Sequence, residues 1–479
     1  MSATEEKTGL LDDDAEVSGR LLKRNTVGRL RSSLFVLCVI FMLVFTAYSG
    51  IQNLESSLNP GIGIYSLASI TGGALVSCIL APTVIRFVGA KWAISSAALC
   101  LAAYVAANFY PKTGVLIPAS ILYGMSSGFM LTAQGTYVTT IAIEYAHVIG
   151  EQAETVISRF FGFFLMAFQS TQIWGNLISS LVLQNGRASH NTTNESNSTV
   201  TICGAAFCPN VASSSSNSSA PSPFPKPPED TLNVLLIIYI GCAMCGFFIG
   251  AFFLKPIRSS SSEDKTTSIV TTLFSTLRLL GTDTNMKLLV PISMYSGVEQ
   301  VVMYAQYTQA YVACELGLAW VGYAMICFGA VNTIASPLNG ILTRYIGRPL
   351  LFLFGFCVNA GMLVLLLMWI PDKDQLFLFF VIPGVWALGD TIWQTQTSAL
   401  VGHVFPSQQE PAFGNIRMFE ALGFFVVYLF SNYVCLDVKL YIVGAWLVLA
   451  VVLVLIVEVR IRYRAVIVYS EAPTDEHSH

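Results

Sequence analysis

Charged residues are scarce in this 479-residue chain, where they make up 11% of the sequence against about 25% in ordinary soluble domains. Hydrophobic residues make up 54%. A water-soluble protein needs more charge than this on its surface, so the composition excludes a soluble enzyme and a disordered scaffold. The net charge of −3 also excludes the basic surface of a nucleic-acid-binding protein. The chain is predicted to be an integral membrane protein.

Motifs for metal and nucleotide chemistry are missing as well. Neither H-E-x-x-H nor a P-loop occurs in the sequence. The segment 124–128 matches the G-x-S-x-G elbow of hydrolases, but it lies inside an apolar run and the five histidines lie in loops or tails. Glycines four residues apart in such a run are typical of close helix packing. We therefore predict no enzymatic activity, no cofactor and no metal.

Long apolar runs are abundant. About 20 helical residues span the roughly 30 Å hydrocarbon core of a bilayer. The first run follows a polar tail of about 30 residues, so it is not a cleavable signal peptide. Twelve runs of sufficient length occur, at about 32–57, 62–85, 92–110, 114–139, 157–184, 232–254, 287–313, 317–341, 349–370, 375–402, 412–434 and 438–459.

Basic residues orient these runs. With a cytosolic N-terminus, 20 of the 25 Lys and Arg fall on the cytosolic side, which agrees with the positive-inside rule. The sequence then places both termini in the cytosol. The N-x-[S/T] acceptors fall together in the longest exterior segment, 185–230, and are predicted to be glycosylated. They are Asn191, Asn194, Asn197 and Asn217.

The chain also repeats itself internally. In order, segment 48–52 resembles 295–299, segment 86–89 resembles 344–347, and segment 124–134 resembles 384–394, at offsets between 247 and 260 residues. Matches in one order at a nearly constant offset indicate two six-helix halves. This all-α arrangement of twelve transmembrane helices is the major facilitator architecture, in which the central cavity lies between the halves.

This architecture divides the chain into five parts. Two six-helix halves are flanked by cytosolic tails and joined by a cytosolic linker, with the first, fourth, seventh and tenth helices at the central cavity. The predicted parts are the N-terminal tail 1–31, the first half 32–254, the linker 255–286, the second half 287–460 and the C-terminal tail 461–479.

Three stretches are similar to the Unc-93 family, in particular to its A-type members. They are residues 45–58, with Tyr48-Ser49-Gly50-Ile51-Gln52, and residues 161–164 and 168–180. The resemblance covers the membrane region but neither the tails nor segment 185–230. It implies a major-facilitator-like fold and a role as an accessory protein that regulates a potassium channel complex or the trafficking of membrane receptors.

The turns after the second and eighth runs bear on transport. Transporters of the major facilitator superfamily usually carry an aspartate there, which helps to latch the halves together. That place holds Arg86 in the first copy and Arg344 in the second, although Gly340, Gly347 and Arg348 fit the pattern of the second copy. The loss of the acid in both copies weakens a transporter interpretation.

Ionisable groups inside the apolar runs need a reason, because each costs about 2.5–3.5 kcal/mol at mid-bilayer. Glu299 and Asp390 lie deep in helices expected at the cavity. They are either proton- or cation-coupling groups, or neutral carboxylic acids bonded to neighbours such as Gln300 and Gln394. Arg417 and Glu420 share a helix face and predict an ion pair. The first half offers only uncharged candidates for the cavity, Gln52, Asn53 and Gln134.

Cysteines on the exterior side predict a disulfide. Cys203 and Cys208 share segment 185–230, so a bond between them is expected in an oxidising compartment. Cys314 and Cys435 also lie near the outer face. Four such cysteines permit three pairings, and the sequence does not choose among them.

The N-terminal tail contains an acidic dileucine pattern, Glu6 with Leu10 and Leu11. It suggests sorting to endosomes or lysosomes, with the plasma membrane as the other location. The first functional hypothesis is a non-enzymatic accessory protein whose partner is another membrane protein, a channel or receptor subunit. The alternative is a secondary transporter of a small solute coupled to protons or cations. Nucleic acid is not expected as a partner.

Overall fold

The computed structural model describes residues 2–58, 62–187, 203–208, 229–257, 274–317, 319–430 and 433–471, and within these ranges it contains helices and no strand. Its elements are α1 (Ser2–Leu58), α2 (Ile62–Val88), α3 (Ala90–Ala107), α4 (Thr113–Ile149), α5 (Ala153–Arg187), α6 (Glu229–Phe253), α8 (Ser275–Thr282), α9 (Thr284–Val301), η2 (Val302–Ala313), α10 (Ala319–Ile346), α11 (Arg348–Met368), η3 (Lys373–Gln375), α12 (Leu378–Val404), α13 (Gln409–Phe430) and α14 (Leu436–Glu471).

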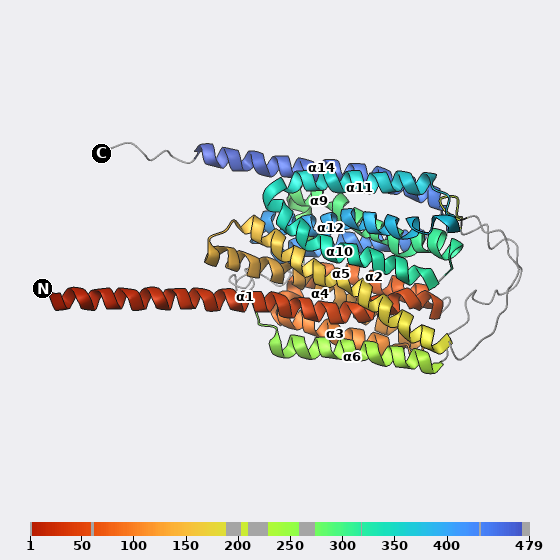
Figure 1. Ribbon diagram of the computed structural model, residues 1–479, viewed down its shortest axis with the longest axis horizontal. Coiled ribbons are helices and arrows are strands. Elements are labelled where there is room, and N and C mark those ends of the chain that lie inside the picture. The colour runs from red at the N-terminus through yellow and green to blue at the C-terminus, as the bar shows by residue number, and fades with distance from the viewer. Residues whose placement is uncertain are drawn as a thin grey trace, which may run out of the picture.

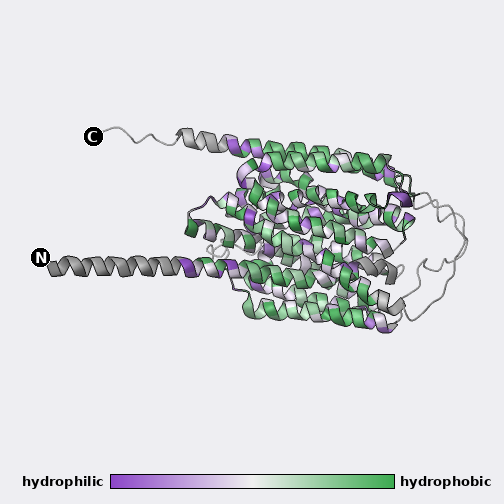
Figure 2. Ribbon diagram, viewed as in Figure 1, coloured by the Kyte–Doolittle hydropathy of each residue, from purple (hydrophilic) through white to green (hydrophobic). Residues whose placement is uncertain are grey.

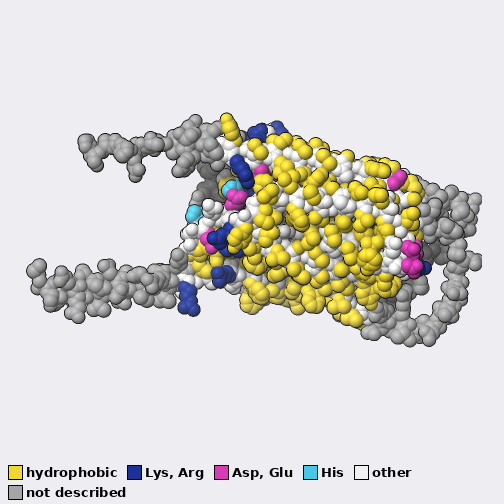
Figure 3. All heavy atoms as spheres, turned by 45° about the horizontal axis from the view of Figure 1, so that its top comes forward, with side chains coloured by type: hydrophobic (Ala, Val, Ile, Leu, Met, Phe, Trp, Pro, Cys, Tyr) yellow, Lys and Arg dark blue, Asp and Glu magenta, His cyan; other side chains and the backbone are white. Residues whose placement is uncertain are grey.

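The long helices lie side by side, and α1 and α14 extend from the same end of the bundle (Figure 1). We call this the terminal end and the opposite one the distal end. Hydrophobic residues dominate the helices between the two ends (Figure 2). On the face shown in Figure 3, hydrophobic side chains cover the flank while charged ones gather at both ends. An apolar flank with charged ends is the surface that a bilayer requires.

Nine helices in the described residues are long and apolar enough to cross a membrane. The long helices α5 and α12 are not among them, and neither is α9, which continues into the π-helix η2. Helix α12 carries a run of buried polar residues that includes Asp390, Gln394 and Gln396. These helices can carry polar residues because the side chains concerned are buried against protein rather than exposed to lipid.

In chain order we divide the long helices into α1–α6 and α9–α14, which we call the first and second group. Inside the first group α1 packs on α5 and α6, and α3 packs on α4 and α6. Inside the second group α9 packs on α13 and α14, and α11 packs on α12 and α14. The same pattern of neighbours therefore occurs twice in chain order. Between the groups, the main contacts join α5 to α10 and α2 to α13.

Tight turns occur at matching places in the two groups. Gly89 joins α2 directly to α3 with φ 84°, and Gly347 joins α10 to α11 with φ 83°. Residues with a Cβ rarely adopt this left-handed region, so glycine is what permits one helix to follow another without a loop. The sequence repeat aligns these two glycines with each other.

Close approach of α5 and α10 also depends on glycine. A Cβ on Gly340 would lie 2.6 Å from the backbone oxygen of Ser158, and one on Gly162 would lie 2.8 Å from that of Ser336. Two glycines that face each other let the backbones meet, as small residues do in membrane helix pairs. The groups are thus in direct contact along this pair of helices.

Candidate functional site

A cavity of about 150 Å³ lies between the two groups. From the first group, α1 supplies Tyr48 and Gln52, and aromatic and small residues of α2, α4 and α5 complete that side. The second group supplies fewer of the described lining residues, but both charged residues of the lining belong to it. Its main polar contributors are Gln300, Tyr304, Gln394, Arg417 and Glu420.

An ion pair forms the charged part of the cavity wall. Arg417 Nη1 donates to Glu420 Oε2 at 2.6 Å, and the side chains are 12% and 13% exposed. Arg417 also lies 3.5 Å from Gln134 Oε1 on α4, and Gln300 Nε2 lies 3.5 Å from Glu420 Oε1. The structure therefore contains the pair that the spacing of Arg417 and Glu420 predicts, and it places the pair where the two groups meet.

Asp390 lies behind the cavity wall and is fully buried. Gln394, one turn further along α12, donates to its Oδ1 at 2.7 Å. Gln169 of α5 donates to its Oδ2 at 3.1 Å. The second bond crosses from the first group to the second. Asp390 is thus connected both to the cavity, through Gln394, and to the other helix group.

Glu299 is also fully buried, at the end of α9. Its Oε2 accepts from Trp386 Nε1 at 2.7 Å and from Asn359 Nδ2 at 3.2 Å. Its carboxyl group lies within hydrogen-bonding reach of that of Asp390. The two acids therefore form one buried pair, held by side chains of α5, α11 and α12.

The expected cavity residues thus fall into two layers. Gln52, Gln300 and Gln394 line the cavity. Glu299 and Asp390 do not, because their side chains turn into the packed interface between helices, where amide and indole donors surround them. The expectation that these acids face the cavity is corrected accordingly.

Two further candidates sit elsewhere. Gln134 is buried on α4, where it meets Arg417 rather than the cavity. The side chain of Asn53 lies outside what the structure describes. Sequence reasoning also missed the donors to the acid pair, Gln169, Trp386 and Asn359. Gln169 gave one usable signal, since an amide in the middle of an apolar run needs a polar partner.

A second charged cluster lies at the terminal end. Arg348, at the start of α11, is 3% exposed. It pairs with Glu154 of α5 and, at 3.0 Å, with Glu458 of α14. His403 of α12 lies 3.7 Å from Glu154. The aspartate place is indeed occupied by Arg344, but an acid of the first group pairs instead with the neighbouring Arg348.

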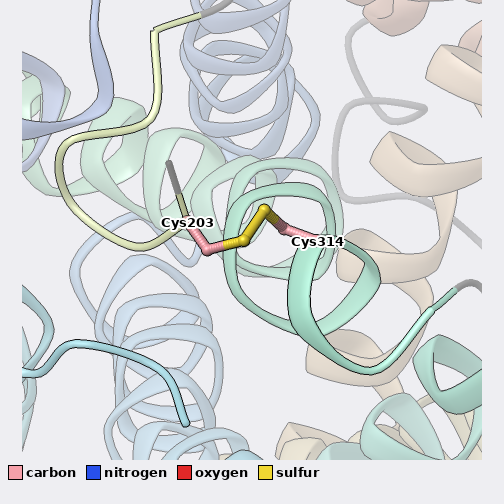
Figure 4. The surroundings of a disulfide bond; sticks show 2 residues. All are labelled: Cys203 and Cys314. Carbon is pink, nitrogen blue, oxygen red and sulfur yellow. A yellow bond between two sulfur atoms is a disulfide. The ribbon is translucent and has the colours of Figure 1, made fainter. Parts of the chain in front are cut away.

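Disulfides hold the distal end. Cys203 is bonded to Cys314, at the end of η2 (Figure 4), and Cys208 is bonded to Cys435, just before α14. The predicted bond between Cys203 and Cys208 is therefore wrong, and a different one of the three pairings occurs. The sequence could not choose because Cys314 and Cys435 approach Cys203 and Cys208 only through the tertiary fold.

Backbone bonds reinforce this attachment. Gly204 N donates to Ala310 O of η2 at 2.9 Å, and Leu436 N donates to Phe207 O at 3.0 Å. The segment 203–208, which stands between α5 and α6 in the chain, is thus bound to the second group. We call it the stapled segment.

The remaining predicted residues cannot be placed. The four acceptor asparagines, Asn191, Asn194, Asn197 and Asn217, lie outside the described residues. The same holds for the side chains of Glu6, Leu10 and Leu11, which belong to the first part of α1.

Comparison with known proteins assigns the family. A family model described as "Ion channel regulatory protein UNC-93" matches residues 55–455. The chain belongs to the UNC-93 family. It is 39% identical over 422 residues to Protein unc-93 homolog A of Bos taurus, which covers 87% of this chain and 90% of the relative. The human protein of the same name is 37% identical over 409 residues, covering 84% and 87%.

A more distant UNC-93 relative carries a functional name. The Caenorhabditis elegans protein unc-93, provisionally named a potassium channel regulatory protein, is 30% identical over 418 residues. The match covers 86% of this chain and 58% of the nematode protein.

Solved structures identify the fold of this UNC-93 family member. The major facilitator superfamily proton:xylose symporter XylE matches with a TM-score of 0.62 at 13% identity, covering 89% of this chain and 95% of that one. The human organic anion transporter MFSD10 matches with a TM-score of 0.61 at 11% identity, covering 88% and 99%. At such low identity the likeness shows the fold alone, and it confirms the predicted all-α, major-facilitator-like class.

Proposed function

We propose that this multi-pass membrane protein is a non-enzymatic accessory protein that regulates a potassium channel complex. The observation that carries the proposal is the match of the ion channel regulatory family model to residues 55–455. The name of the nematode relative supplies potassium as the ion. A partner in the membrane is consistent with an apolar flank that can contact both lipid and another membrane protein.

The first test is physical association. The full chain, tagged at its C-terminus, is purified from native membranes, and a potassium channel subunit is expected among the recovered proteins. A tagged transporter of the same fold serves as the control. Recovery of no channel subunit, or equal recovery with the control, contradicts the proposal. Co-expression with the recovered channel is then expected to change its current.

We further propose twelve membrane crossings in two six-helix halves, 32–254 and 287–460, with tails 1–31 and 461–479 and linker 255–286 in the cytosol. The doubled pattern of helix neighbours and the matching glycine turns support the duplication. The excess of Lys and Arg toward the terminal end supports the orientation. The distal end, with its disulfides, then faces an oxidising compartment.

Glycan mapping tests this orientation. We propose that Asn191, Asn194, Asn197 and Asn217 carry glycans on the exterior side. Replacing all four by Gln is expected to abolish the loss of mass that a glycosidase causes in the parent protein. A parent protein from mammalian cells whose mass no glycosidase changes contradicts the proposed exterior position.

We also propose that the protein resides in the plasma membrane and reaches endosomes or lysosomes through Glu6, Leu10 and Leu11. Replacing both leucines by alanine is expected to increase the fraction at the cell surface, measured by surface biotinylation. The matched control is Leu21→Ala with Leu22→Ala in the same tail. An unchanged surface fraction contradicts the sorting role.

A second candidate function is secondary transport of a small solute coupled to protons or cations. The observation that favours it is the cavity between the groups, with an ion pair on its wall and buried acids behind it. Glu299→Gln combined with Asp390→Asn is expected to abolish the dependence of any uptake or current on pH. Uptake with an unchanged pH dependence excludes coupling through these acids.

A further inference from the structure

Glu299 and Asp390 are two buried acids whose charge no basic side chain balances among the described residues. Both side chains are fully buried, and their carboxyl groups reach each other. Among the described residues, no Lys, Arg or His forms an ion pair with either acid. Three of the four carboxyl oxygens accept a hydrogen bond from a protein donor. Glu299 Oε1 is buried and has no donor in the described part of the chain.

Two ionised carboxylates in contact, without a cation, repel each other strongly in a buried site. Two hydrogen-bond acceptors also cannot bond to each other unless one of them carries a proton. A single proton removes both problems, because it halves the charge and supplies the missing donor. We propose that Glu299 and Asp390 form a proton-binding site that holds one proton shared between the two carboxyl groups.

The surroundings of the site connect it to two other parts of the molecule. Gln394 bonds Asp390 and lines the cavity, so only one side chain separates the site from the cavity. Gln169 bonds Asp390 from α5, so the site also touches the first helix group. A hydrogen bond to an ionised carboxylate is roughly twice as strong as one to a neutral acid. Release of the shared proton therefore strengthens the contact between α5 and α12.

The inference goes beyond the proposed channel role and does not rest on it, since it uses only the groups around Glu299. It also holds whether or not a solute is carried. A monovalent cation could replace the proton by the same charge argument, and the experiment separates the two. The proton is favoured here because four directed donors already occupy three of the four carboxyl oxygens, and the two carboxyl groups lie close to each other.

The test is infrared difference spectroscopy of the purified full-length protein in lipid nanodiscs. A protonated carboxylic acid has a carbonyl stretch that is resolved from the bands of carboxylates and that shifts in heavy water. The parent protein is expected to show this band near neutral pH, in sodium and in choline buffers alike. Glu299→Gln and Asp390→Asn are each expected to shift it, because the acid that remains is still buried but no longer shares its proton, and the double variant is expected to lose it.

Glu420→Gln is the matched control, since Glu420 is a neighbouring acid that is already paired with Arg417. It is expected to retain the band. Absence of the band in the parent protein, an unshifted band in either single variant, or its persistence in the double variant overturns the proposal. A band that appears only when sodium is removed shows a cation site and overturns it as well. The buffer comparison uses the parent protein alone, so it decides the question even if a variant does not fold.

Gln169→Leu tests the link to the first helix group. It removes one donor from Asp390 but neither acid, so the band is expected to keep its intensity and to shift in frequency. An unshifted band shows that Gln169 does not sense the proton and overturns that part of the proposal.

Discussion

The two ends of the bundle join the helix groups by different kinds of bond. At the distal end, two disulfides fasten the stapled segment, which precedes α6 in the chain, to the second group. At the terminal end, α5 meets α10 and α11 through glycine packing, the Ser158–Thr343 hydrogen bond and the ion pairs of Arg348. The distal bonds are insensitive to local charge and yield only to reduction, whereas the terminal contacts depend on charge and shape. We therefore expect the terminal end to be more sensitive than the distal end to single substitutions.

The largest expected effect is at Arg348. Arg348→Leu leaves two acids of the terminal cluster without their partner, which costs about 3–5 kcal/mol when a buried pair is broken from one side. The measurement is thermal unfolding of the purified protein, followed by tryptophan fluorescence. Arg344→Leu, which removes an exposed arginine from the preceding turn, is the control. Equal losses in the two variants contradict the role of the terminal cluster.

The second-largest loss of stability is expected when the disulfide between Cys208 and Cys435 is removed. Replacing Cys208 and Cys435 together by Ser is expected to lower stability by about 2–4 kcal/mol, as for other disulfides that close long loops. Unfolding under non-reducing conditions measures this loss. Cys245→Ser, at an exposed free cysteine, is the control and is expected to be neutral. If the double variant unfolds at the same temperature as the parent protein, this disulfide does not stabilise the fold.

A smaller effect is expected where α5 and α10 touch. Gly340→Ala places a methyl group 2.6 Å from a backbone oxygen of α5, and such overpacking costs about 1–3 kcal/mol. Gly361→Ala on α11, where a Cβ meets nothing within 4 Å, is the control and is expected to be neutral or stabilising. The unfolding temperatures of the two variants are compared. Equal temperatures contradict a close contact between α5 and α10 at Gly340.

The smallest effect is expected at Arg29, whose ion pair with Glu144 has side chains 51% and 44% exposed. Removing an exposed pair of this kind costs about 0–1 kcal/mol, because water and salt already screen it. Arg29→Ala is therefore expected to shift the unfolding temperature far less than Arg348→Leu. A shift as large as that of Arg348→Leu means that burial does not explain the strength of the terminal cluster.

Sequence alone predicted the positions of the helices well, because apolar length and the turn glycines are local signals. The run expected at 349–370, for example, corresponds to α11 at Arg348–Met368. The pair of Arg417 and Glu420 was also predictable, since a spacing of three residues places both side chains on one helix face.

The environment of the acids was not predictable from the sequence. Trp386, Asn359 and Gln169 come from three helices, and only their packing brings them to Glu299 and Asp390. The disulfide pairing failed for the same reason, because its partners lie 111 and 227 residues apart. Contacts at such separations are set by the tertiary fold rather than by local sequence.

The polar interface between the groups has a consequence for biosynthesis. A helix leaving the ribosome enters the bilayer according to its own hydrophobicity, and a lone acid at its centre opposes entry by about 2.5–3.5 kcal/mol. Helix α12 carries Asp390 and is not among the helices that are apolar enough by themselves in the described residues. Its partner Gln169 lies on α5, which is synthesised more than 200 residues earlier. Helix α12 is therefore best inserted alongside the first group already in the membrane, so that assembly of this interface and entry into the bilayer are one event.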